Sequence, residues 1–146
     1  MPSIITQLTP EGAVVEALVG VSQHRSAVMR GLQVPVPEPV RLRFLVDTGA
    51  TSTNISQGRL AGLNLPSIGV VDLYTASSGS TPVQCDEYDV SLVFPDSVPA
   101  PWGIASINVI ECLPLDGPID GLLGRAVLSC AILTYNPFAN VVTISF

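Results

Sequence analysis

Short runs of alternating apolar and polar residues are spread along the chain, and they predict β-strands rather than long helices. The clearest run is 40–47, where one face is made by Val40, Leu42, Phe44 and Val46. Other strand-like runs are 13–21, 70–75, 83–94, 104–111, 119–123, 131–135 and 141–146. Many short strands at close spacing predict an all-β barrel or sandwich.

The remaining segments predict turns and little helix. Residues 56–63 are expected to form one or two helical turns with Ser56 as N-cap, and 125–130 a short helix. Residues 22–39, with three prolines, are expected to be mostly a connection, and Asp116-Gly117-Pro118 a turn. Trp102 is expected to pack within the proline-rich loop 95–103.

Composition bounds the function. A chain of 146 residues predicts one domain. It is 47% hydrophobic and 12% charged, with a net charge of −6, so we expect neither nucleic-acid binding nor docking on anionic membranes. No run is long and apolar enough to predict a transmembrane helix. Such sparse charge favours an apolar interface with a partner.

Metal and thiol chemistry are also restricted. The single histidine, His24, lies in a polar segment and is expected to be solvated. Cys85, Cys112 and Cys130 are widely spaced without a CxxC pair, which excludes a zinc ribbon, and we expect no metal or cofactor. They are expected to be reduced, packed as small apolar residues. The first residues do not resemble a secretory signal, so a reducing, cytoplasmic location is expected.

The candidate chemistry lies at Asp47-Thr48-Gly49, where an apolar strand ends in a carboxylate. Burying a charge is costly unless it is paired or protonated. Gly49 permits a sharp turn, and Thr48 can brace the loop by hydrogen bonds. The alternative is an ordinary Asx-turn at a strand end. Arg41 and Arg43, which share the Asp47 face, are expected to be solvated.

Two further segments give Asp47 a context. The segment Leu45-Val46-Asp47-Thr48-Gly49-Ala50-Thr51-Ser52 resembles the active-site strand and loop of retroviral-type aspartic proteases, the retropepsins. Near the C-terminus, Gly121-Leu122-Leu123-Gly124-Arg125 resembles the second motif of that family. Between them, 74–83 and the following 87–90 resemble its flap hairpin and returning strand. The resemblance covers 38–146 and leaves 1–37 as an N-terminal extension with a probable strand.

The resemblance implies a single-domain closed barrel with a flap hairpin and one short C-terminal helix. It implies an aspartic endopeptidase that needs no cofactor and cleaves an extended peptide with a water activated by two carboxylates sharing a proton. The chain has one Asp-Thr-Gly, so Asp47 from each subunit of a homodimer would form the dyad. Asp116 and Asp120 are interpreted as turn acids. The implied catalytic residues are Asp47, Thr48 and Gly49; the substrate-binding ones Ala50, Ala76, Ser77, Ser78 and Gly79; and the structural motif Leu122, Leu123, Gly124 and Arg125.

Two positions depart from the family pattern. Many retropepsins have an acid where this chain has Thr51, and Asp or Asn where it has Ala126. Arg125 therefore needs another acid or backbone carbonyls as acceptors. These departures keep two alternatives open: a retropepsin-fold binding or dimerisation module with little or no proteolysis, and an unrelated β-sandwich interaction domain. The extension 1–37 could add a strand pair, cover a sheet edge or be exchanged between subunits.

Overall fold

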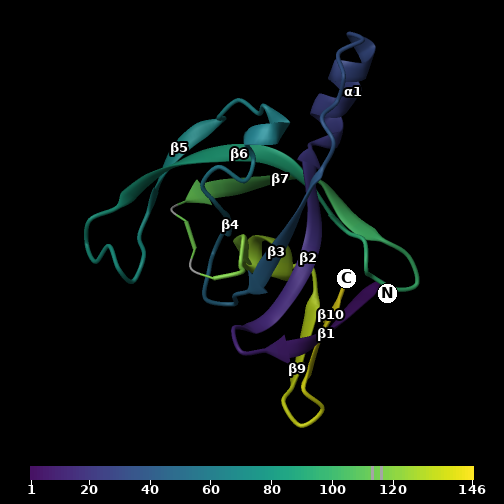
Figure 1. Ribbon diagram of the computed structural model, residues 1–146, viewed down its shortest axis with the longest axis vertical. Helices are drawn as coiled ribbons and strands as arrows, with labels where there is room; N and C mark the ends of the chain where they lie inside the picture. Colours follow the sequence, from purple (N-terminus) through teal and green to yellow (C-terminus); the bar gives the residue numbers. More distant parts are fainter. Residues whose placement is uncertain (113, 116) are drawn as a thin grey trace.

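The computed structural model describes residues 1–112, 114–115 and 117–146, and most of its regular structure is β (Figure 1). The strands are β1 (Ser3–Thr9), β2 (Gly12–Val21), β3 (Val40–Val46), β4 (Thr53–Ser56), β5 (Gly69–Leu73), β6 (Val83–Phe94), β7 (Trp102–Cys112), β8 (Gly121–Leu123), β9 (Ile132–Asn136) and β10 (Val141–Ser145). The helices are α1 (Gln23–Gly31), the 3-10 turn η1 (Ala61–Leu63) and α2 (Arg125–Leu128). None of these helices is long and apolar enough to cross a membrane.

The strands close into a barrel around one core. They are hydrogen-bonded in the order β5-β6-β7-β4-β8-β3-β2-β1-β10-β9. Strand β2 also pairs with β6, and this additional pairing closes the sheet on itself. The closed ring therefore contains β6, β7, β4, β8, β3 and β2. Its core includes the fully buried Phe44, Ile55, Leu92, Val109 and Leu123. The prediction of an all-β, single-domain closed barrel is confirmed, and the β-sandwich alternative is wrong.

Strand β3 illustrates how alternation produces this barrel. Leu42 and Phe44 are buried in the core, whereas the intervening arginines point outward. Arg41 forms an ion pair of 2.6 Å with Glu16 on β2, and Arg43 donates to the carbonyl of Pro118 at 3.2 Å. The expectation that both arginines are surface charges is confirmed. Strand β6 has the predicted bounds because its alternation is equally clear.

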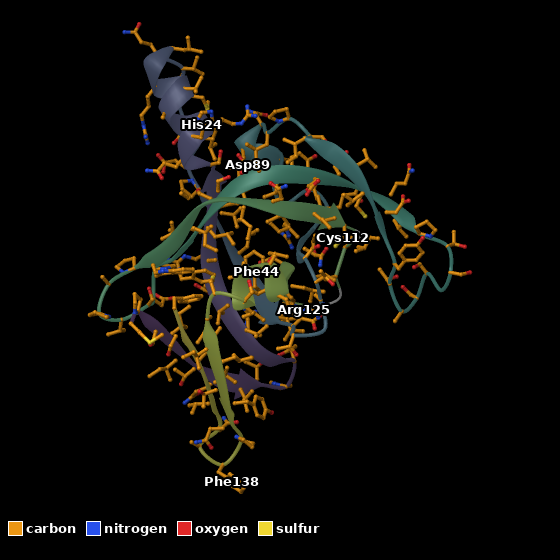
Figure 2. All side chains as sticks on the ribbon, turned by 180° about the vertical axis from the view of Figure 1, so that it is seen from behind. His24, Phe44, Asp89, Cys112, Arg125 and Phe138 are labelled. Carbon is orange, nitrogen blue, oxygen red and sulfur yellow. The ribbon has the colours of Figure 1, made fainter. Side chains whose placement is uncertain are left out.

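The expectation of a connection between 22 and 39 is wrong over its first half. Residues Gln23–Gly31 form α1, which starts where the Ser22 side chain accepts a hydrogen bond from the Arg25 amide at 3.4 Å. The helix projects from the barrel, and Ser26 is its only buried residue (Figure 1). It therefore lacks the apolar stripe that identifies a helix in sequence. His24 lies exposed on this helix (Figure 2).

Several local expectations change in detail. Trp102 is the first residue of β7 and stacks on Phe146, with ring centroids 3.8 Å apart. It therefore packs against the C-terminal residue and not within its own loop. Only 61–63 of the segment 56–63 is helical, since Ser56 is the last residue of β4 and residues 57–60 form turns. Asp116, in the expected turn 116–118, lies outside the described residues.

Two strands of the first 37 residues, β1 and β2, are integral to the sheet. Strand β2 is part of the barrel, since it pairs with both β3 and β6. Strand β1 pairs with β10, so the two ends of the chain lie side by side in one small sheet with β9 (Figure 1). Of the three alternatives for this extension, the structure contains the added strand pair. Phe138 lies exposed at the tip of the β9–β10 hairpin, opposite α1 (Figure 2).

Candidate active site

Asp47 follows directly after β3, at the end of the parallel pairing between β3 and β8. Val46 lies opposite Leu123 in the parallel pair β3–β8, and the Asp47 amide donates to the carbonyl of Leu123 at 3.0 Å. The two segments that carry the sequence resemblance, 76 residues apart at Asp47 and Leu123, are therefore hydrogen-bonded neighbours. A parallel pairing of this kind holds the end of β3 at a fixed position in the barrel.

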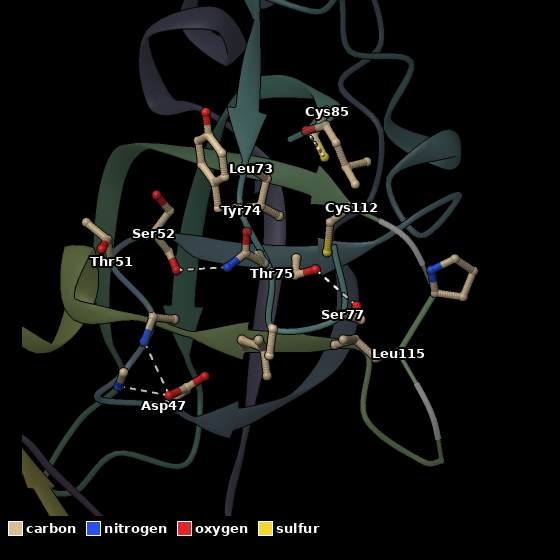
Figure 3. A pocket seen from close by; sticks show the side chains of 17 residues that line it. Asp47, Thr51, Ser52, Leu73, Tyr74, Thr75, Ser77, Cys85, Cys112 and Leu115 are labelled. Atoms are coloured by element: carbon tan, nitrogen blue, oxygen red, sulfur yellow. Dashed lines mark hydrogen bonds between the residues drawn. The ribbon is translucent and has the colours of Figure 1, made fainter. Parts of the chain in front are cut away.

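The Asp47 carboxylate is oriented by the backbone of its own loop. Its Oδ1 accepts hydrogen bonds from the amides of Gly49 at 2.8 Å and Ala50 at 3.3 Å (Figure 3). Within the described part of the chain, Oδ2 has no hydrogen-bond partner. Asp47 is half-buried, while Thr48 and Gly49 are exposed. The loop therefore fixes one carboxylate oxygen and leaves the other available to a second molecule.

The glycine of the second motif lets α2 approach this loop. A Cβ on Gly124 would lie 2.1 Å from the carbonyl oxygen of Ser52, far closer than side chains tolerate. This close approach permits two backbone hydrogen bonds, from the Arg125 amide to Ala50 at 2.9 Å and from the Ala126 amide to Thr51 at 3.0 Å. The start of α2 is thereby joined to the residues that follow Asp47.

The Arg125 side chain donates hydrogen bonds to three residues of the same loop. One guanidinium nitrogen donates to the carbonyls of Thr48 at 2.8 Å and Gly49 at 3.2 Å, and the other donates to the Thr51 hydroxyl at 3.0 Å. Backbone carbonyls thus replace the acid that many retropepsins place at position 51. Arg125 is exposed, so this arrangement does not require a buried unpaired charge.

A cleft of about 800 Å³ opens between the Asp47 loop and the β5–β6 hairpin (Figure 3). Asp47, Gly49 and Ala50 form one side of its lining, and Leu122 of β8 contributes apolar surface. Ala76 and Ser77 of the hairpin tip also line it. Asp47 is the only carboxylate of the lining among the described residues. The other sequence-based candidates, Thr48, Ser78, Gly79, Leu123, Gly124 and Arg125, lie outside the lining.

The hairpin tip is organised by side chains rather than by a strand ladder. The Thr75 amide donates to the Ser78 hydroxyl at 2.9 Å, and the Ser78 amide donates back to the Thr75 hydroxyl at 3.1 Å. Gly79 has φ +61°, and a Cβ there would meet no atom within 4 Å, so this glycine serves the turn itself. The tip presents Tyr74 and Thr75 to the cleft, two residues that sequence reasoning did not single out.

Three other unforeseen lining residues come from strands whose pairing could not be read from the sequence. Asn54 on β4, Cys85 on β6 and Cys112 on β7 reach the cleft together. Asp120, interpreted above as a turn acid, instead braces the barrel, because its carboxylate accepts from the Arg43 amide at 2.9 Å and pairs with Arg59 at 3.0 Å. Asp120 does not line the cleft.

Comparison with known proteins supports the fold alone. No protein-family model and no curated protein sequence matches this chain. Among solved structures, the chain is similar to a retropepsin-like aspartic protease from Rickettsia conorii, with a TM-score of 0.57 and 15% sequence identity. The similarity covers 99% of this chain and 90% of that protein. The closed barrel, the flap-like hairpin and the Asp47 loop are thus arranged in a retropepsin-like fold.

Proposed function

We propose that this protein is an aspartic endopeptidase whose active site is completed by a second copy of the same chain. The observation that carries the proposal is the position of Asp47, held by loop amides on one oxygen and facing a cleft beneath a hairpin. Because the described cleft contains no other carboxylate, one chain offers half of a two-carboxylate site. A two-fold axis beside Asp47 would supply the other half.

The chemistry follows from two carboxylates at close range. Like charges so close cannot both ionise, and the pair therefore shares one proton. The ionised carboxylate accepts a proton from a water molecule, which attacks the peptide carbonyl carbon. The protonated carboxylate donates to the carbonyl oxygen as the tetrahedral intermediate forms. The amides of Gly49 and Ala50 keep the Asp47 carboxylate in position throughout.

The shape of the cleft favours an extended peptide as substrate. The hairpin tip has main-chain groups next to the cleft at Thr75, Ala76 and Ser77, where a peptide strand can pair with them. A hairpin above a cleft can also open for entry and close to exclude water. Leu73, Val83 and Leu122 provide apolar contacts for substrate side chains.

Several exposed features support self-association. Thr48, Gly49 and Arg125, beside the candidate dyad, are all exposed in the single chain. Large apolar side chains are also exposed elsewhere, among them Ile132 and Tyr135 of the edge strand β9. Exposed apolar surface of this kind commonly marks an interface. A second copy would cover surface that the low charge content leaves prone to association.

The decisive experiment compares Asp47→Asn with Asp96→Asn, a matched change at an exposed aspartate outside the cleft. Purified wild type and Asp96→Asn should cleave unfolded peptides at equal rates and be blocked by a statine-type inhibitor. Asp47→Asn should lose about a thousand-fold in rate. Sedimentation of the wild type should show a dimer. Equal cleavage by the Asp47→Asn variant contradicts the proposal.

One observation favours a second candidate function. Arg125 is satisfied within its own chain by Thr48, Gly49 and Thr51, so the loop is complete without a partner. A chain that stays monomeric would bind peptides in the cleft without cleaving them. Peptide binding by calorimetry, together with a monomer in sedimentation and no turnover at any pH, would establish this binding module instead.

A further inference from the structure

Two cysteines share the wall of the candidate cleft. Cys85 is the third residue of β6, the strand that returns from the hairpin tip. Its side chain is buried, with 5% of the residue exposed. Cys112 is the last residue of β7 and is half-buried. Both line the cleft, and both are free thiols in the structure (Figure 3). The proposed mechanism uses neither of them.

Strand register places these two residues opposite each other. In the antiparallel pair β6–β7, Glu87 pairs with Ile110 and Asp86 with Glu111. Continuing this register by one position sets Cys85 against Cys112. Directly opposed residues project from the same face of a sheet, which agrees with the presence of both side chains in one cleft.

The spacing of such a pair suits a covalent bond. Opposed residues of an antiparallel pair have Cα atoms about 4.5–5.5 Å apart. Disulfides usually join Cα atoms about 4.4–6.8 Å apart, so opposed positions of this kind lie within the range that a disulfide spans. Burial raises the pKa of both thiols, and the next contribution to the raised pKa of Cys112 comes from Cys85 itself. Both thiols therefore stay protonated at neutral pH and react only as the pH rises.

We propose that Cys85 and Cys112 form a reversible disulfide across the cleft wall when the protein meets a small disulfide such as oxidised glutathione. The thiolate of the more accessible Cys112 attacks one sulfur of the small disulfide, forms a mixed disulfide and releases one glutathione thiolate. The Cys85 thiol then loses its proton, attacks the Cys112 sulfur and releases the second glutathione. Two protein thiols are oxidised by two electrons, and one small disulfide is reduced to two thiols.

The bond would restrain the hairpin above Asp47. Strand β6 continues from Cys85 back to Val83 and then to the tip, and both Val83 and Leu73 line the cleft. A covalent tie between β6 and β7 would hold the returning arm against the barrel and reduce the opening that an entering peptide needs. This effect on cleavage rests on the proposed function, whereas formation of the bond does not.

The bond is tested first by chemistry alone, in a Cys130→Ser background that removes the exposed third thiol. The protein is incubated with oxidised glutathione near pH 8, because the raised pKa values leave few thiolates at lower pH. It is then unfolded, alkylated and weighed as an intact chain. The expected product accepts no alkyl group and is lighter by two hydrogens, and reduction with dithiothreitol restores two alkylatable thiols.

The matched control is Cys85→Ser in the same background, which should carry one glutathione on Cys112 and no internal bond. The inference is overturned when the Cys130→Ser protein keeps two free thiols, or carries two glutathiones with no internal bond. Such a result leaves the proposed function intact wherever the reduced protein cleaves peptides.

Cleavage is the second measurement. Oxidation should slow peptide cleavage by the Cys130→Ser protein about ten-fold, and dithiothreitol should restore it. In the Cys85→Ser control, oxidised and reduced samples should differ much less. Equal cleavage by the bonded and the reduced protein overturns the regulatory effect. A bond that forms in Asp47→Asn, with no cleavage by any variant, supports the disulfide while contradicting the proteolytic function.

Discussion

Replacement of Gly124 by alanine tests how closely α2 must approach the Asp47 loop. A Cβ at this position would lie 2.1 Å from the carbonyl oxygen of Ser52 and 2.9 Å from that of Ala50. Both atoms belong to the backbone, so neither can rotate away. The helix and the loop must separate by more than an ångström before they reach the 3.4 Å at which ordinary contact begins.

The cost follows from the contacts that this separation breaks. Two backbone hydrogen bonds cross the contact, from the Arg125 amide to Ala50 at 2.9 Å and from the Ala126 amide to Thr51 at 3.0 Å. Each contributes about 1 kcal/mol, and overpacking adds about 1–3 kcal/mol. We expect the free energy of unfolding to fall by about 3–5 kcal/mol. Peptide cleavage should fall about a hundred-fold, because the carboxylate of Asp47 moves with the loop.

The assay is urea unfolding followed by the fluorescence of Trp102, together with peptide cleavage by the folded variant. Gly62→Ala is the matched control, since a Cβ on Gly62 meets no atom within 4 Å. This control should leave stability unchanged or raise it by about 0.5 kcal/mol. A Gly124→Ala protein that unfolds at the same urea concentration as the control, and cleaves as fast, refutes the reasoning.

Three further changes test other parts of the structure. Trp102→Ala should lower the free energy of unfolding by about 3 kcal/mol, because it removes the ring stacked on Phe146. Trp102→Phe should recover most of this loss, with urea unfolding of both variants followed by circular dichroism because they lack the only tryptophan. Asp120→Asn should cost about 1 kcal/mol, less in high salt, since it removes the ion pair with the largely exposed Arg59. Burial raises the pKa of the Cys112 thiol, so the folded protein holds this proton more tightly than the unfolded chain does; the resulting stability is fully present below pH 9.0, the ordinary thiol value, and is lost as the pH rises through the raised pKa. Thermal unfolding of wild type and Cys112→Ser above pH 9.0 should show this loss in the wild type alone.

Alternation of apolar residues was sufficient to predict the strands that face the core on one side. Strands β3 and β6 were predicted with nearly their observed bounds, because alternate residues such as Phe44 and Val90 are fully buried. Helix α1 was missed for the converse reason, since it buries only Ser26 and has no apolar face. Strand β1 was also missed, because Ile4 is buried while the adjacent Ile5 is exposed, which obscures the pattern.

The residues that line the cleft were predictable only in part, because the register between strands cannot be deduced from the local sequence. Asp47, Ala76 and Ser77 were named from motifs, and they do line the cleft. The cysteine pair was not foreseen. A register shift between Val90 and Leu92 moves β7 along β6 by one residue. Without that shift, Cys85 would lie opposite Glu111, and the two thiols would not face each other.

The departures at positions 51 and 126 can now be understood from the way the Asp47 loop is held. Every hydrogen bond described around that loop involves the backbone on at least one side, apart from the bond between Arg125 and the Thr51 hydroxyl. The bonds at Thr51 and Ala126 use a main-chain carbonyl and a main-chain amide, which are the same whatever side chains those residues carry. A threonine and an alanine are therefore compatible with a correctly placed Asp47. What they remove is an ion pair with Arg125, so the geometry of the loop should depend little on ionic strength.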